Sequence, residues 1–200
     1  MARAKNFFSD FDVQESIDEK GRKRKVLIYK GNTWTMQVPE EKLPRRKIFF
    51  LVLTLVMVGL SVFANLQNVA GNRSGIAAGA GLIFFVAAFF MGYSCIYSLI
   101  LKTPVLQRAQ YRETSIYLKI GSAAAAVLAL TAMVTHIVIA AIGEIPGERG
   151  GEILAAALWL AAGGIAAVLF FWEMKTEYVQ KRNDGTVVRK EHFRRGSETY

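Results

Sequence analysis

Four long apolar runs constrain this chain more than any other feature of its sequence. They cover about residues 48–70, 76–101, 120–142 and 153–172. An α-helix rises about 1.5 Å per residue, so a helix of about 20 residues crosses a hydrocarbon core of about 30 Å. In lipid the backbone N–H and C=O groups must pair within each segment, which excludes open strands. The sequence therefore predicts an all-α integral membrane protein with four transmembrane helices.

The basic residues are distributed unevenly between the two sides of these runs. Of the 25 Lys and Arg residues, 23 precede the first run, follow the fourth or lie between the second and third. Only Arg73 and Arg149 lie in the other two connections. Basic segments next to membrane helices are retained on the cytoplasmic side. We therefore expect a multi-pass protein of the cell membrane whose N-terminus, middle loop and C-terminus are cytoplasmic.

The net charge of +9 would suggest a nucleic-acid partner in a soluble domain. Here the basic flanks of membrane helices account for it, so we expect no nucleic-acid binding. The segment before the first run lacks an apolar core near its start, which argues against a cleavable signal peptide. The single cysteine, Cys95, lies inside the second run and offers neither a disulfide framework nor a metal cluster.

The two tails carry the patterns of β-hairpins. The turn residues are Gly31-Asn32 in the first tail and Asn183-Asp184-Gly185 in the second, each between strand-like segments. The predicted domains are an N-terminal tail over 1–47 with a hairpin over 25–38, a four-helix bundle over 48–172, and a C-terminal tail over 173–200 with a hairpin over 178–193.

A lone two-stranded hairpin is marginally stable in water, so we expect the two hairpins to pair into one small sheet. Two independent hairpins are the alternative. The residues that we expect to form a partner-docking surface there are Trp34, Met36, Tyr178 and Phe193. Before the first hairpin, Phe7, Phe8, Phe11 and Ile17 form a loose helical stripe among acidic residues, for which we expect disorder or docking on a partner.

Among Asp, Glu, Lys, Arg and His, the interior of the four runs holds one residue, His136. Ionisable groups are costly in hydrocarbon and often mark transport pathways. A candidate polar path combines His136 with Asn65, Gln67, Thr131 and Thr135. The alternative is a neutral imidazole that is hydrogen-bonded near the membrane surface, with the polar residues marking where the helices meet water. We interpret Glu152 as a carboxylate that stabilises a helix N-terminus and Glu173 as a solvated flank.

The sequence contains no pattern typical of catalysis, metal binding or haem ligation. We therefore expect no catalytic, metal or cofactor-binding residues and no cofactor. The leading hypothesis is a non-catalytic scaffold, assembly or regulatory subunit, with the lipid bilayer and a membrane protein or a second copy of the chain as partners. The alternative is a small transporter or channel with a path near Asn65 and His136. An intramembrane enzyme acting on lipid is disfavoured, because no nucleophile and base share a leaflet.

Overall fold

The computed structural model describes residues 11–17, 23–101, 103–142, 148–181 and 187–191. The chain divides into two compact units. The larger unit consists of residues 38–102 and 112–176, and the smaller unit combines residues 1–37, 103–111 and 177–200. The smaller unit therefore gathers three segments that the long helices separate in the sequence.

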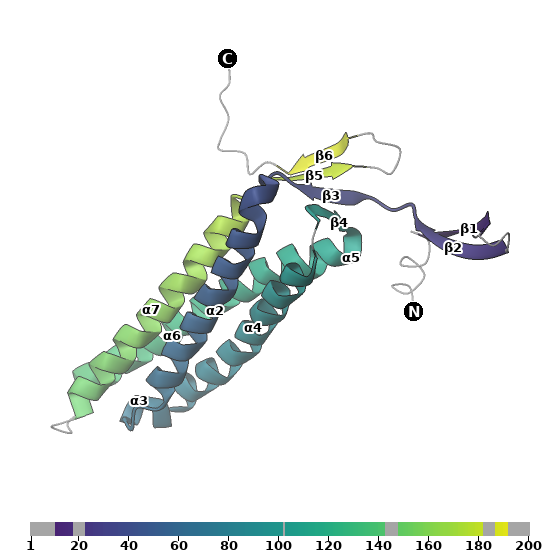
Figure 1. The fold of residues 1–200 in the computed structure, drawn as a ribbon. Helices are drawn as coiled ribbons and strands as arrows, with labels where there is room; N and C mark the ends of the chain where they lie inside the picture. Colours follow the sequence, from purple (N-terminus) through teal and green to yellow (C-terminus); the bar gives the residue numbers. More distant parts are fainter. Residues whose placement is uncertain (1–10, 18–22, 102, 143–147, 182–186, 192–200) are drawn as a thin grey trace, which may run out of the picture. The chain divides into compact units, whose positions relative to one another are not determined.

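The larger unit is a bundle of four long helices (Figure 1). They are α2 (Leu43–Asn65), α4 (Gly75–Ile100), α6 (Tyr117–Ile142) and α7 (Glu148–Met174). Four helices of the described chain are long and apolar enough to cross a membrane, which agrees with the four predicted runs. The helices pack in a ring, α2 against α4, α4 against α6, α6 against α7, and α7 against α2.

The ends of the helices differ from the predicted runs, most of all around the first. A 3-10 turn, η1 (Glu40–Lys42), leads directly into α2, which starts with Pro44 in its first turn. Proline suits this position because the first helical N–H groups have no partner in any case. At its other end α2 stops at Asn65, and a separate short helix, α3 (Ala70–Arg73), precedes α4. The first helix therefore begins and ends about five residues before the predicted run.

The middle of the bundle is filled by apolar side chains. Met57, Phe84, Met91 and Leu169 have no exposed surface, and the alanines Ala125, Ala129, Ala162 and Ala166 are equally buried. Small residues let the helices approach closely. A Cβ on Gly163 would lie 3.1 Å from the Cβ of Ala129. Such close contact supplies the dispersion energy that holds helices together where no hydrophobic force acts between them.

The outer faces of the helices are also apolar. Phe89 is 71% exposed and Leu82 is 70% exposed, and further large hydrophobic residues follow along all four helices. Soluble monomers rarely expose apolar areas of this extent. A bundle that is apolar both inside and outside is typical of a helical membrane protein.

The smaller unit contains two sheets. A two-stranded sheet joins β1 (Phe11–Ile17) to β2 (Lys23–Tyr29). A four-stranded sheet has the order β4-β3-β5-β6, with β3 (Thr33–Met36), β4 (Val105–Gln107), β5 (Tyr178–Lys181) and β6 (Val187–Glu191). All of its neighbouring strands are antiparallel. The short helix α5 (Arg108–Tyr111) follows β4.

The strand pairing corrects the predicted hairpin over 25–38. Its first strand pairs with β1 instead, with Phe11 opposite Tyr29, and its second strand, β3, lies between β4 and β5. The two tails do pair with each other, as predicted, with Met36 opposite Tyr178. In the C-terminal tail β5 pairs with β6 as the expected hairpin requires, while residues 182–186, 192 and 193 lie outside the described residues.

The stretch before the first hairpin is the second difference in this unit. The sequence predicts a loose helical stripe there, with disorder or docking on a partner, but residues 11–17 form the strand β1. Phe11, Val13 and Ile17 recur at even spacing, which is the period of a strand, and Glu15 stands opposite Lys25 in the ladder. Residues 7 and 8 of the proposed stripe lie outside the described residues.

Candidate functional site

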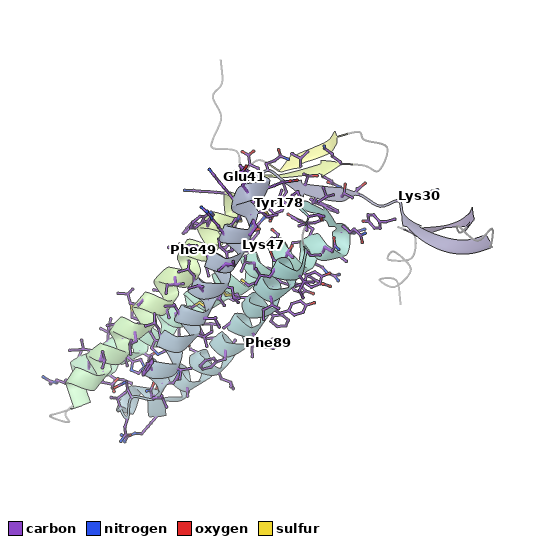
Figure 2. All side chains as sticks on the ribbon, viewed as in Figure 1. Lys30, Glu41, Lys47, Phe49, Phe89 and Tyr178 are labelled. Carbon is purple, nitrogen blue, oxygen red and sulfur yellow. The ribbon has the colours of Figure 1, made fainter. Side chains whose placement is uncertain are left out.

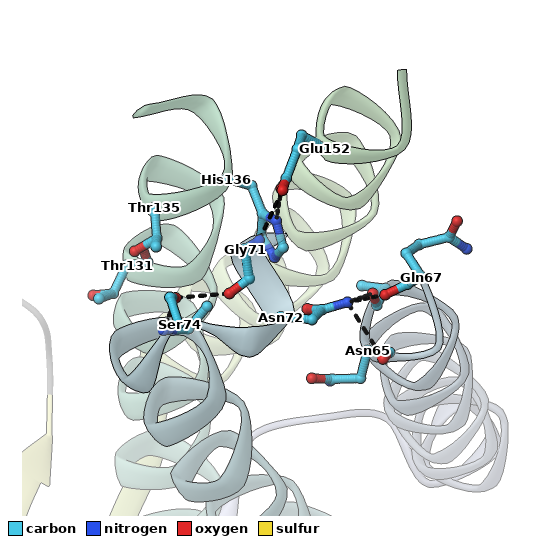
Figure 3. A network of polar contacts seen from close by, with 11 residues as sticks. Asn65, Gln67, Gly71, Asn72, Ser74, Thr131, Thr135, His136 and Glu152 are labelled. Atoms are coloured by element: carbon cyan, nitrogen blue, oxygen red, sulfur yellow. Dashed lines mark hydrogen bonds and ion pairs between the residues drawn. The ribbon is translucent and has the colours of Figure 1, made fainter. Parts of the chain in front are cut away.

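A buried polar cluster lies at the end of the bundle where α3 joins α2 to α4 (Figure 3). Its centre consists of His136 from α6, Glu152 from α7 and the backbone of Gly71 in α3. His136 has no exposed surface and Glu152 is 2% exposed. We call this group the α3 cluster.

The Glu152 carboxylate holds the α3 cluster together through both of its oxygens. The Gly71 N–H donates to Oε1 over 2.7 Å, and Nδ1 of His136 lies 2.6 Å from Oε2. A buried carboxylate is stable only when its oxygens are paired in this way. With Oε2 as acceptor, the imidazole donates through Nδ1–H. One side chain of α7 therefore fixes both α3 and α6.

Gly71 is required at its position because the side chains of the cluster leave no room for a Cβ. A Cβ there would lie 2.5 Å from Oε2 of Glu152, and still closer to Nδ1 of His136. Only glycine permits the backbone N–H to approach the carboxylate at this distance. Gly71 is buried, so the contact lies inside the protein.

Asn72 and Ser74, on either side of Arg73, complete the connection between α2 and α4. The Asn72 amide donates to the backbone oxygens of Ala64 and Gln67, over 2.8 and 2.7 Å, at the C-terminal end of α2. Both carbonyls also accept a backbone N–H, Ala64 O from Gln67 and Gln67 O from Val69, so the Asn72 amide adds a further donor to each. Ser74 is the N-cap of α4, because its Oγ accepts from the N–H of Ala77 over 3.2 Å.

Three buried polar atoms of the described residues have no hydrogen-bond partner, and all three belong to this end of the bundle. They are Nε2 of His136, Oδ1 of Asn72 and Nε1 of Trp159. Trp159 packs edge-on against Phe84 and lies near Gly81, where an added Cβ would be 3.1 Å from Oδ1 of Asn65. Unpaired buried polar atoms cost about 1–3 kcal/mol each. This end of the bundle therefore holds all of the unpaired buried side-chain nitrogen and oxygen atoms among the described residues.

The structure does not gather the residues of the predicted polar path into one lining. His136 is buried, whereas Thr131 is exposed and donates to the backbone oxygen of Val127 in its own helix. Thr135 likewise donates to Thr131 O, and Gln67 is partly buried and donates to Phe63 O in its own chain segment. Asn65 is partly buried, but its amide donates to Ser61 O one turn earlier. Of the five residues, only His136 contacts a buried ionisable group of another helix.

A second buried polar cluster lies at the opposite ends of α2 and α7. Nη2 of Arg46 lies 2.8 Å from Oε2 of Glu173 and also donates to Thr176 Oγ1. Oε1 of the same carboxylate accepts from Ser115 Oγ over 2.7 Å. Glu173 is 3% exposed, so it is not the solvated flank that the sequence suggested. The guanidinium of Arg46 also covers the ring of Phe50, 5.0 Å from its centroid.

Ser115 belongs to a π-helical turn, η2 (Arg112–Ile116), directly before α6. A π-turn interrupts the regular helical ladder and leaves carbonyl groups for other donors. Ser94 of α4 supplies one, because its Oγ donates to the Glu113 backbone oxygen over 2.7 Å. This irregular turn therefore connects α4, α6 and α7 near the Arg46–Glu173 pair.

The residues of the expected docking surface lie in the four-stranded sheet, with the exception of Phe193, which is outside the described residues. Trp34 stands opposite Leu106 and stacks on Tyr111, with ring centroids 5.1 Å apart. Tyr178 is 1% exposed and meets Tyr111 edge-on at 5.0 Å. Trp34, Met36 and Tyr178 thus lie on the same side of the sheet, where Tyr178 is buried and Trp34 and Met36 are partly buried.

Sequence reasoning missed the roles of four residues in these sites. The role of Glu152 was readable in part, since it is the acidic residue of the fourth run at the level of His136. Arg46 and Glu173 stand at the facing ends of the first and last runs, which also hinted at a pair. The role of Gly71 carried no signal, because a glycine near a predicted turn has many ordinary explanations.

The described residues contain no group of three or more His, Cys, Asp and Glu that could hold a metal ion. The two polar clusters consist of side chains that hydrogen-bond to one another and to the backbone. In comparisons with known proteins, no family model, curated protein or solved structure matches this chain.

Proposed function

We propose that this chain is a non-catalytic, multi-pass subunit of a membrane complex, in which a bundle of four transmembrane helices presents a small cytoplasmic sheet to a partner protein. The observation that carries the proposal is the set of chain segments that contribute strands to that sheet. Strands β3, β4 and β5 come from before the first long helix, from between the second and third, and from after the fourth. A chain that spans a membrane four times brings these three segments to the same side.

The charge distribution supports the cytoplasm as that side. The three segments and their flanks hold 23 of the 25 basic residues. Positive residues near membrane helices favour the cytoplasmic side. Sheet and charge are independent observations, because backbone pairing does not depend on the number of lysines.

The bundle supports a structural role in place of transport. Its buried ionisable pairs lie at its two ends and connect helices, and apolar side chains such as Met57, Phe84 and Met91 fill the middle. Glu152 and Glu173 are 21 positions apart on α7, about 32 Å along a helix, which matches a hydrocarbon core of about 30 Å. The polar clusters thus fit the two membrane surfaces, where water is within reach.

The docking face that we propose is the side of the sheet opposite Trp34 and Tyr178. Residues that face each other across antiparallel strands share one side of a sheet, so Thr35, Val105 and Val179 lie together on the other side. Val105 is 45% exposed, and Val179 is partly exposed. The edge strands β4 and β6 also offer backbone groups to a strand of a partner.

Crosslinking in native membranes, followed by purification and quantitative mass spectrometry, tests the proposal. We expect the wild-type chain to carry one partner at a constant ratio, either another protein or a second copy. The variant Val105→Asp should lose that partner, whereas Lys30→Glu, outside the strands of the sheet, should keep it. Recovery of the wild-type chain without any stoichiometric partner would overturn the proposal.

A proton-coupled transporter is the second candidate, and one observation favours it. The His136–Glu152 pair is buried among helices, and Nε2 of His136 has no partner among the described residues. Such a pair is the usual element of a proton relay. Flux assays in liposomes with the double variant His136→Leu and Asn65→Leu test this candidate. Unchanged flux would eliminate the path, and loss of a wild-type flux would favour it over the scaffold.

A further inference from the structure

The outer surface along the contact of α2 with α7, which we call the α2/α7 groove, combines exposed aromatic side chains with basic ones at one end of the bundle. Phe49 of α2 contacts Trp172 of α7, with ring centroids 5.4 Å apart. Phe49, which is labelled in Figure 2, is 44% exposed and Trp172 is 43% exposed, so the pair forms part of the outer surface. Phe50 also meets Trp172, edge-on at 5.6 Å, and anchors the indole from the inner side.

Two basic side chains flank this aromatic pair. Arg45 precedes Phe49 by four residues, and Lys175 follows Trp172 by three. Each is therefore about one helical turn beyond its aromatic neighbour, about 5 Å along the axis. Because α2 and α7 run antiparallel and meet at Phe49 and Trp172, both basic residues lie toward the same end of the groove.

Arg45 and Lys175 are available to a ligand. Both are exposed, and neither forms a side-chain hydrogen bond or ion pair with a residue that the structure describes. Their neighbour Arg46, by contrast, is 12% exposed and committed to Glu173. Glu41, four residues before Arg45, forms no ion pair with it. The two positive charges are thus not neutralised by any described part of the chain.

Below the aromatic pair the same helix faces are apolar. Val52 and Val56 follow Phe49 at helical spacing on α2, and Val168 precedes Trp172 by one turn on α7. These three side chains are 46–51% exposed. The order along the groove is therefore basic, aromatic and aliphatic, which matches the phosphate, glycerol and acyl regions of a phospholipid in a bilayer.

We propose that the α2/α7 groove binds one anionic phospholipid, with its phosphate between Arg45 and Lys175, its glycerol against Phe49 and Trp172, and an acyl chain along Val52 and Val168. This inference rests on the proposed placement of the bundle in a bilayer. The net positive charge at the mouth of the groove selects an anionic headgroup over a zwitterionic one. Arg45 lies in the first long helix and Lys175 directly follows the last one, so one bound lipid would contact both helices.

Native mass spectrometry of the full chain in detergent tests the site. The probes are phosphatidylglycerol and phosphatidylcholine with identical acyl chains. We expect the wild type to retain phosphatidylglycerol in preference to phosphatidylcholine. In the double variant Arg45→Gln and Lys175→Gln this preference should fall about tenfold, because each basic residue near an anionic lipid contributes on the order of a few-fold in affinity. The control Arg112→Gln and Lys181→Gln removes the same charge elsewhere and should keep the preference. Equal losses in both double variants, or a wild type without preference, would overturn the site.

Fluorescence quenching provides a second measurement on the same protein. Bromine atoms on the acyl chains of phosphatidylglycerol should quench Trp172 more strongly than the same atoms on phosphatidylcholine. The variant Trp172→Phe identifies this component, because Trp159 is buried in the bundle and Trp34 lies in the sheet unit. Equal quenching by both lipids in the wild type would contradict the proposal.

Alkaline extraction from vesicles of phosphatidylcholine alone separates the two proposals. Release of the chain from these vesicles would overturn the multi-pass placement and the lipid site together. A chain that stays in the vesicles but shows no preference for phosphatidylglycerol would overturn the lipid site alone.

Discussion

At the scale of single residues, the bundle depends on two carboxylates of α7. Glu152 accepts from the Gly71 N–H and from His136, and Glu173 binds Arg46 and Ser115. Each carboxylate is buried and reaches two other chain segments. Removing one partner of such a pair leaves the other buried without compensation, which costs far more than the pair itself contributes.

The first prediction concerns Gly71. The substitution Gly71→Ala places a methyl group against His136 and Glu152, so we expect it to lower the free energy of unfolding by about 1–3 kcal/mol, the usual cost of overpacking. Thermal unfolding of the purified protein in detergent measures the effect. The control Gly79→Ala has open space around its Cβ and lies inside α4, where alanine favours the helix. Equal stability of the two variants would mean that α3 does not dock on the carboxylate.

The second prediction concerns Arg46 and Glu173. We expect Arg46→Leu or Glu173→Leu alone to destabilise the bundle by about 3–5 kcal/mol, because each removes the oppositely charged partner of a buried charge. The double variant should lose less than the sum of the two, since it leaves neither charge behind. Unfolding in sodium dodecyl sulfate gives the four stabilities of this double-mutant cycle. Additive losses would show that the two residues do not interact.

At the scale of elements, the sheet unit is held by aromatic packing across segments. Tyr111 of α5 stacks on Trp34 of β3 and meets Tyr178 of β5, so one ring connects the middle loop to both tails. Cross-strand neighbours and aromatic pairs are the main stabilising contacts of small sheets. The short strands, of three to five residues, need this additional packing.

The third prediction tests that connection. We expect Tyr111→Ala to expose Trp34 and to increase quenching of tryptophan fluorescence by iodide, an ion that stays in water. Trp159 is 1% exposed and will contribute little to the change. The control Tyr117→Ala removes a ring that packs against Phe90 in the bundle. If both variants leave iodide quenching at the wild-type level, Trp34 does not depend on Tyr111.

The helices and the strands differ in how far the sequence predicts them. The long helices were predictable because twenty or more apolar residues leave few alternatives in lipid. The positions of the strands were predicted well, but their pairing partners were not. Local pattern shows that 33–36 is a strand, but not that its neighbours are 105–107 and 178–181, since such pairing depends on distant segments. The three residues of β4 are too few to give a pattern at all.

At the scale of the whole molecule, the pairing of the strands limits the number of times that the helices between them can cross a membrane. The four membrane crossings that we propose bring β3, β4 and β5 to one side, and the hydrogen-bonded pairing of these strands requires all three to lie on the same side. An odd number of crossings would separate the two tails. The predicted orientation came from charge, and the pairing of the tails supports an even number of crossings without reference to charge.

The polar sites were less predictable than this architecture. His136 stood out because it is the only histidine within an apolar run, but its partner Glu152 belongs to the next helix, and only the packing of α6 against α7 brings them together. The placement of the path residues was hidden for the same reason, since a sequence does not show that Thr131 is exposed while His136 is buried.

The fourth prediction addresses the central claim, that four helices cross the membrane and leave the sheet on one side. In a Cys95→Ala background, single cysteines replace Arg73 and Arg149 at one end of the bundle, and Lys30, Gln107 and Lys181 in the sheet unit. A membrane-impermeant maleimide is then applied to intact cells and to inverted membrane vesicles. We expect labelling at 73 and 149 only from outside the cell, and at 30, 107 and 181 only in inverted vesicles. Labelling of 30, 107 and 181 from different sides, or of 73 and 149 from the same side as 107, would contradict the account.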